Sequence, residues 1–181
     1  MQEGLKKTLN LGDFNYEPSP PPDGVETVFK PRMKLKNVRD EIYEGDWSKR
    51  GLKHGKGIMI NKRGVHEGYY SKDMKSGRGR MIYFDGRVYE GEWKENLWHG
   101  NGTIDFQNGS RYEGQMKRHQ FDGYGKLIES DGSSFSGYWS RRKKHGLGEE
   151  RDSLGRVVRK GLWKDNKYVS STASVSVVRH L

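Results

Sequence analysis

Apolar and polar residues alternate over short stretches of this chain, which is the pattern of strands that bury one face. Between residues 89 and 93, two aromatic residues and a glycine alternate with glutamates, and between 102 and 106 a glycine and two apolar residues alternate with Thr103 and Asp105. The polar stretch 94–99 ends at a glycine, which indicates a turn, and Asn108-Gly109 is a strong two-residue turn signal. Residues 89–109 therefore predict one β-hairpin.

The same hairpin pattern recurs along the chain. The glycine of a Tyr-Glu-Gly-x-Trp motif returns at intervals of 23 or 24 residues, a Gly-x-Gly pair follows it in five copies, and a further glycine closes each copy. An isolated hairpin is marginally stable in water, so consecutive copies are expected to stack. The sequence predicts an all-β fold, an elongated single-layer antiparallel β-meander of five 23-residue hairpins plus terminal half-repeats. The recurring glycines are Gly45, Gly68, Gly91, Gly114, Gly137 and Gly161.

Aromatic residues occupy matching places in successive copies, and a thin sheet has little else to bury. We expect them to form the core on one face, with the recurring glycines leaving room for the ring of the neighbouring copy. About 12 strands spaced by about 4.8 Å would give a sheet roughly 55 Å long. The expected core aromatic residues include Tyr43, Trp47, Tyr89, Trp93, Tyr112 and Trp139.

The chain divides by this pattern into four parts. Residues 1–32 contain a proline-rich run and are expected to form an extended arm. Residues 33–42 are expected to form a degenerate half-repeat whose strand, residues 33–38, caps the sheet with Leu35 and Asn37 facing inward. The sheet spans 43–166, and the tail 167–181 has β-branched residues that suit the edge of this sheet or of a partner's. The copies are 43–65, 66–88, 89–111, 112–134 and 135–158, with a half-copy at 159–166.

Positive charge gathers at one place in this pattern. The formal net charge is +10, and the predicted hairpin tips hold twelve basic residues against three acidic ones. In a meander these tips share one long edge of the sheet, so the sequence predicts a basic stripe that suits an acidic partner surface. A merely solvated face remains the alternative. The basic tip residues are Lys49, Arg50, Lys53, Lys72, Lys75, Lys94, Lys117, Arg118, Arg141, Arg142, Lys143 and Lys144.

Two apolar residues, Trp98 and Phe121, occupy matching places at adjacent tips. One interpretation is that they contact each other across the repeat spacing of about 10 Å. The other is that Trp98 anchors a partner, as an exposed tryptophan beside arginine often does.

Candidate chemistry is weak throughout, and no catalytic, cofactor-binding or metal-binding residue is predicted. A strand follows each Gly-x-Gly pair, whereas a phosphate-binding loop needs a helix N-terminus there. His54 and His99 lie two repeats apart, about 20 Å, which is too far for one zinc ion. The absence of cysteine, of a secretory signal and of any apolar run near the roughly 20 residues of a membrane span predicts an intracellular address.

The motifs at 89–96 (Tyr-Glu-Gly-Glu-Trp-Lys-Glu-Asn) and 99–103 (His-Gly-Asn-Gly-Thr) resemble the membrane occupation and recognition nexus (MORN) repeat. The resemblance covers about 43–165 and extends to the ciliary radial-spoke-type members. It implies a non-catalytic scaffold in a ciliary (axonemal) or related cytoskeletal assembly, without a cofactor. We expect protein partners to bind through the sheet faces, the basic hairpin-tip edge and the extended arms, and the tip charge favours partners with acidic surfaces. These are the expectations that the resemblance and the charge give together. The alternatives to a scaffold are a peripheral membrane tether that binds anionic phospholipid and a non-catalytic subunit of an enzyme complex. Nucleic acid is disfavoured because the core needs the aromatic rings.

Overall fold

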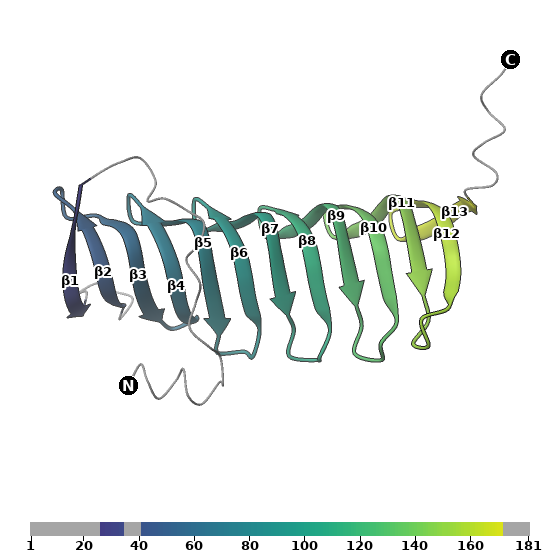
Figure 1. The fold of residues 1–181 in the computed structure, drawn as a ribbon, viewed down its shortest axis with the longest axis horizontal. Helices are drawn as coiled ribbons and strands as arrows, with labels where there is room; N and C mark the ends of the chain where they lie inside the picture. Colours follow the sequence, from purple (N-terminus) through teal and green to yellow (C-terminus); the bar gives the residue numbers. More distant parts are fainter. Residues whose placement is uncertain (1–25, 35–40, 172–181) are drawn as a thin grey trace, which may run out of the picture.

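A computed structural model describes residues 26–34 and 41–171. Over these ranges the chain forms one open antiparallel sheet of 13 strands, each hydrogen-bonded to the next in sequence order, and no helix (Figure 1). The predicted all-β meander is confirmed. The strands are β1 (Thr27–Lys34), β2 (Ile42–Ser48), β3 (Lys53–Asn61), β4 (Gly64–Ser71), β5 (Met74–Tyr83), β6 (Val88–Lys94), β7 (Leu97–Asp105), β8 (Arg111–Lys117), β9 (Gln120–Ile128), β10 (Ser134–Ser140), β11 (Lys143–Arg151), β12 (Val157–Lys164) and β13 (Lys167–Ser171).

An unbroken row of paired glycines crosses the sheet from β2 to β12. In the second to fifth copies the marker glycine pairs with the second glycine of a Gly-x-Gly pair on both sides, as Gly91 does with Gly79 and Gly102. One aromatic ring per copy folds onto this row, and the Tyr89 hydroxyl donates to the Glu92 carbonyl at 2.7 Å. The row consists of Gly45, Gly57, Gly68, Gly79, Gly91, Gly102, Gly114, Gly125, Gly137, Gly148 and Gly161.

This row corrects one expectation about the glycines. A Cβ on Gly91 would lie 2.6 Å from the hydroxyl of Tyr89, a residue of the same copy. The marker glycine therefore makes room for its own tyrosine rather than for a ring of the neighbouring copy. A ring of a neighbouring copy lies instead against the second glycine of the Gly-x-Gly pair: the Trp93 indole donates to the carbonyl oxygen of Gly79, on the adjacent strand, at 3.1 Å.

The core lies on the face that carries these rings. Tyr43, Tyr89 and Tyr112 are completely buried, and the tryptophans at 47, 93 and 139 are at most 6% exposed. Adjacent rings meet edge to face, as Tyr89 and Trp93 do at 5.2 Å between centroids. The predicted rows are thus packed against one another along the sheet.

The strand that covers β2 lies elsewhere than expected. β1 begins at Thr27 rather than at Met33, and Lys30 stands opposite Gly45 where the repeats place a glycine. A register shift between Lys30 and Met33 explains why counting back by the repeat period fails. Leu35 and Asn37 lie outside the described residues. At the other end, the first residues of the tail form β13 and pair with β12 of the same sheet.

Candidate partner-binding surfaces

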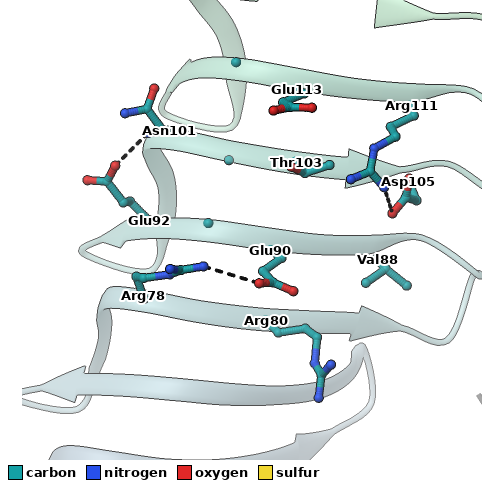
Figure 2. Close-up of a pocket in the computed structure, with 13 residues that line it drawn as sticks. Arg78, Arg80, Val88, Glu90, Glu92, Asn101, Thr103, Asp105, Arg111 and Glu113 are labelled. Atoms are coloured by element: carbon teal, nitrogen blue, oxygen red, sulfur yellow. Dashed lines mark hydrogen bonds and ion pairs between the residues drawn. The ribbon is translucent and has the colours of Figure 1, made fainter. Parts of the chain in front are cut away.

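Over β5 to β8, the face opposite the core is polar and rich in ion pairs. A hollow of about 630 Å³ crosses β5 to β8 there (Figure 2). Each of its three arginines is paired with a carboxylate. Arg78 reaches the Glu90 carboxylate at 3.3 Å, and Arg111 reaches that of Asp105 at 2.7 Å. Because these cations already have acidic partners, the hollow offers little free positive charge to a ligand, whereas Glu92 and Glu113 form no ion pair among the described residues.

The hairpin tips form the second candidate surface, which we call the tip edge. Five tips are two-residue turns in which both residues have positive φ, for example Arg141 at 48° and Arg142 at 67°. This is the type I′ geometry that matches strand twist. Nine of the twelve predicted basic residues are exposed here: Lys49, Arg50, Lys72, Lys94, Lys117, Arg118, Arg141, Arg142 and Lys143.

Some of the exposed cations have local partners. Lys49 pairs with Glu26, Lys143 lies 3.7 Å from the Asp165 carboxylate, and Arg142 donates to the His119 carbonyl at 2.8 Å. The other six form no ion pair within the described part of the chain. These six are spread over five successive tips, so the free positive charge follows the whole edge.

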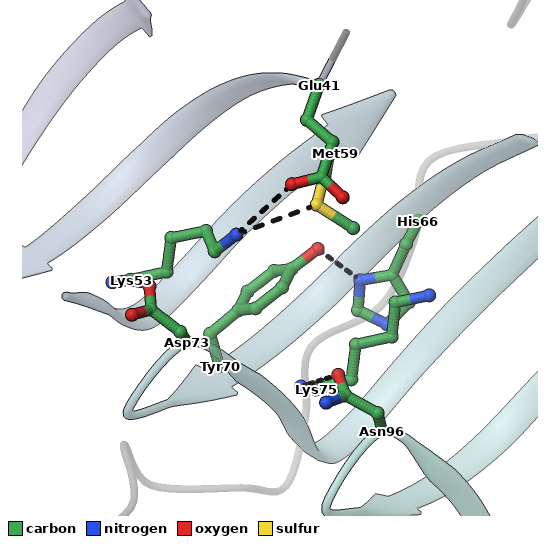
Figure 3. A network of polar contacts seen from close by, with 8 residues as sticks. All are labelled: Glu41, Lys53, Met59, His66, Tyr70, Asp73, Lys75 and Asn96. Carbon is green, nitrogen blue, oxygen red and sulfur yellow. Dashed lines mark hydrogen bonds and ion pairs between the residues drawn. The ribbon is translucent and has the colours of Figure 1, made fainter. Parts of the chain in front are cut away.

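Three residues that the sequence predicted at the basic tips, Lys53, Lys75 and Lys144, are packed against the core instead, so the prediction was wrong for them. Lys53 is only 8% exposed, and its Nζ lies 3.9 Å from both the Glu41 carboxylate and the Met59 sulfur (Figure 3). Lys75 extends over the Trp93 ring, with its Nζ 4.8 Å from the centroid. Burial, with Arg63 nearby, lowers the pKa of Lys75 to about 8.

Lys144 is the third of these residues. Its Nζ lies 2.6 Å from the Glu150 carboxylate and within 4.8 Å of the ring centroids of Phe135 and Trp163. The aliphatic stem of lysine packs on rings while its ammonium keeps an acidic or aromatic partner. The three lysines therefore stabilise the sheet and add little to the charge that a partner would meet.

His66 stands where the other copies have tyrosine or phenylalanine, and it is also a core residue. Its Nδ1 lies 2.7 Å from the Tyr70 hydroxyl (Figure 3). Its ring also meets that of Trp93 edge to face, with 5.1 Å between centroids. Complete burial, with Lys75 nearby, holds its pKa well below the usual value, so the imidazole is neutral at pH 7. Its contacts are those of a packing group.

Trp98 is a core residue rather than an exposed anchor. It is 3% exposed and stacks on Tyr89 at 4.7 Å, while Phe121 stacks on Tyr112 at 3.6 Å. Each ring therefore packs on the tyrosine of its own hairpin. Spacing could have shown this, because Lys53, Lys75, Trp98, Phe121 and Lys144 hold the same place in successive copies.

Comparison with protein families agrees with the repeat geometry. The MORN repeat model matches residues 43–64, 66–86, 89–111, 112–134 and 135–153. The chain belongs to the MORN repeat family. No curated protein matches it in sequence.

Among solved structures, the MORN chain is similar to the SAS-4 (dCPAP) TCP domain in complex with a proline-rich motif of Ana2 (dSTIL) of Drosophila melanogaster. The identity is 18%, the TM-score is 0.28, and the match covers 83% of this chain and 87% of that one. At this TM-score the two folds do not superpose as wholes, and the likeness carries no functional meaning.

The MORN sheet has one apolar surface that sequence reasoning missed. Tyr124, Tyr138, Leu147 and Leu162 lie on β9 to β12, on the face opposite the core, and each is at least 37% exposed. Tyr124 is paired with Tyr138 and Leu147 with Leu162 across neighbouring strands. The signal was present in the sequence, because these residues follow a marker glycine or stand inside a Gly-x-Gly pair.

Among residues 26–34 and 41–171, no cluster of three or more histidines and carboxylates could hold a metal ion. The described residues contain no helix that could span a membrane.

Proposed function

We propose that this MORN protein is a non-catalytic structural scaffold that holds protein partners with acidic surfaces in a ciliary (axonemal) or related cytoskeletal assembly. The observation that carries the proposal is the tip edge, where nine exposed cations follow one long side of the sheet. Clustered like charges raise the local concentration of an oppositely charged surface and speed its association.

The shape of the sheet supports a docking role. Its 13 strands in one layer extend over roughly 55–60 Å at about 4.8 Å per strand. A partner that follows the tip edge meets several cations at once, so weak single contacts act together. Two described groups with strongly lowered pKa values, His66 and Lys75, are packed on aromatic rings, which fits a structural role.

A peripheral membrane tether is the second candidate, because the same edge would meet anionic phospholipid. Attraction to an anionic leaflet is worth about 1 kcal/mol per lysine or arginine near the surface. The protein surface is favoured because the cations form a line along one edge rather than a flat patch. A non-catalytic subunit of an enzyme complex would bind its partner through the same tip edge. This candidate differs from the scaffold only in that the partner is an enzyme.

A charge-neutralised tip variant tests the proposal: Lys117→Ser, Arg118→Asn, Arg141→Asn and Lys143→Ser. Asparagine at 118 and 141 suits the left-handed backbone there, with φ 50° and 48°. We expect the native chain to co-sediment with microtubules, whose surface is acidic, and the variant to bind about tenfold more weakly at low salt.

The outcomes separate the candidates. Flotation with phosphatidylserine vesicles that is strong in the native chain and lost in the variant, without microtubule binding, would favour the membrane tether. Equal binding and equal salt dependence of native chain and variant would mean that the tip edge is only a solvated face. Imaging of the tagged chain in ciliated cells tests the axonemal assignment.

A further inference from the structure

Three adjoining hollows on the core face form one groove, which we call the core-face groove. Their volumes are about 460, 510 and 320 Å³. The first and second share Asp85 and Arg87, and the second and third share Leu127 and Glu129. Along the groove lie Trp98, Phe121 and Lys144 on β7, β9 and β11, which spans about 19 Å at the strand spacing. A segment of about six extended or 13 helical residues has this length.

The end of the groove near β5 is basic. Lys62, Arg63, Arg87 and Arg142 line it, and its one carboxylate, Asp85, is held by Arg87 at 2.7 Å. Lys62 and Arg63 are exposed and form no ion pair among the described residues. The pKa of His119 is lowered, first by burial and then by Lys75, Arg142, Arg63 and Arg87, which agrees with an accumulation of positive charge here.

The groove changes character along its length. Its middle is apolar, where half-buried Phe106 and Leu127 flank Phe121. At the far end, Glu129, Glu150 and Asp152 replace the apolar residues that earlier copies carry at these places. Lys144 holds Glu150 and Arg156 holds Asp152, whereas Glu129 is exposed without an ion pair among the described residues. A ligand therefore meets cations, then rings, then a carboxylate.

We propose that the core-face groove binds a peptide segment of a protein partner in which a block of acidic residues adjoins a block of apolar residues. The acidic block lies against Arg63 and Arg142, and the apolar block covers Phe106 and Leu127. Glu129 repels the acidic block from the far end, which fixes the orientation of the segment. This inference rests on the proposed scaffold function and names the partner chemistry of a second surface, which shares Arg142 with the tip edge.

A peptide fits this groove better than a membrane does. Side chains of both long sides of the sheet border its first hollow, Lys62 and Arg63 from the turn between β3 and β4, and His119 and Arg142 from the tips. A flat bilayer would meet these borders first, whereas a single segment reaches the rings between them. Burying the apolar block supplies affinity, and the paired charges supply specificity.

A random library of about 12-residue peptides, displayed on phage and selected on the full chain, tests the proposal, since that length spans the groove. The enriched peptides are then synthesised, and their affinities are measured by fluorescence anisotropy. The groove variant is Lys62→Glu with Arg63→Glu. The matched control, Lys94→Glu with Lys117→Glu, makes the same change of charge at exposed tip lysines that line none of the three hollows.

We expect the enriched peptides to combine acidic and apolar blocks, to bind the groove variant at least about tenfold more weakly, and to bind the control within about twofold. Leu127→Glu, in the apolar middle, should weaken the same peptides. Circular dichroism and thermal unfolding establish that each variant is folded. If Leu127→Glu is not folded, Leu127→Ser takes its place.

Four results would each overturn the proposal. They are a failure to enrich any peptide, enriched peptides that lack acidic residues, an equal loss of peptide affinity in the groove and control variants, and undiminished binding of a peptide whose apolar block is replaced by serine. Vesicle binding that falls in the groove variant while peptide binding does not would also overturn it and assign the groove to lipid. The tip variant described above separates the two proposals. If it loses microtubule binding and keeps the peptides, both stand; if microtubules never bind but the peptides do, the groove stands alone.

Discussion

The side-chain oxygen of Asn96 accepts a hydrogen bond from the backbone N–H of Lys75, one repeat earlier, at 2.9 Å. The backbone N–H of Asn96 in turn donates to the carbonyl of Lys75 at 3.1 Å. Equivalent side-chain bonds join Asp73 to Lys53, His119 to Trp98 and Asn166 to Lys144. Each tip is therefore tied to the preceding one, and the tip edge keeps a fixed spacing of its cations.

Asn96→Ala should lower the free energy of unfolding by about 1–2 kcal/mol, because it removes one hydrogen bond and places alanine at φ 68°. Urea unfolding followed by tryptophan fluorescence measures this. Asn96→Gly keeps the conformation and should cost less. Asn101→Ala, at an exposed strand position, is the control and should stay within about 0.5 kcal/mol. Equal effects at 96 and 101 would show that the tie between repeats contributes nothing.

Gly102→Ala should destabilise the sheet by about 1–3 kcal/mol through crowding alone. The added Cβ would lie 2.7 Å from the Tyr89 ring and hydroxyl, and Gly102 does not have a positive φ. Gly155→Ala isolates the backbone strain of a side chain at positive φ, because φ is +79° there and no atom lies within 4 Å of the added Cβ. That change should cost about 1 kcal/mol. Thermal unfolding of the two variants compares them, and a harmless Gly102→Ala would contradict the packing of Tyr89 on the glycine row.

Lys75 should make the sheet more stable as the pH rises from 7.5 to 9.5. Its pKa of about 8 in the folded chain lies below that of an exposed lysine, so the unfolded chain binds more protons in this range. The gain should reach about 2 kcal/mol at most. Urea unfolding at both pH values measures it, and the same measurement on Lys75→Met separates it from the onset of tyrosine ionisation near pH 9.5. Lys75→Met should remove the slope, and an unchanged slope would assign it to another group.

The repeat period alone predicted the sheet, because each 23-residue copy carries its own strand alternation and turn glycines. It also placed the rings of Tyr89 and Trp93 in the core. The sequence-based prediction failed for lysine, which is exposed at some tip positions and packed on aromatic rings at others. Lys53, Lys75 and Lys144 are basic residues near a tip, yet their places in the copies are those of Trp98 and Phe121, which pack on tyrosines. β1 was misplaced because Lys30 replaces the glycine that marks the register.

The groove illustrates what the sequence could not show. Arg63 and Arg142 lie far apart in the chain and in different kinds of turn, so no spacing rule joins them. The structure brings both to one hollow because the turn between β3 and β4 and the tip of β10 and β11 border the same face. The sequence alone shows one feature of the groove: the last two copies depart from the repeat pattern by placing Glu129, Glu150 and Asp152 where other copies have apolar residues.

Lys143 and Lys144 are adjacent in sequence and should behave in opposite ways. Lys144→Ser removes an ion pair with Glu150 and the packing on Phe135 and Trp163, so it should lower the free energy of unfolding by about 2 kcal/mol. Lys143→Ser changes an exposed side chain and should cost less than about 0.5 kcal/mol. Lys144→Met should recover part of the loss, since it keeps the packed stem. Conversely, Lys143→Ser should weaken binding to microtubules at low salt, and Lys144→Met should leave it almost unchanged. Urea unfolding and co-sedimentation on the same three variants decide the matter. If the two serine variants lose equal stability, or if Lys144→Met weakens binding as much as Lys143→Ser does, then Lys144 belongs to the tip edge after all.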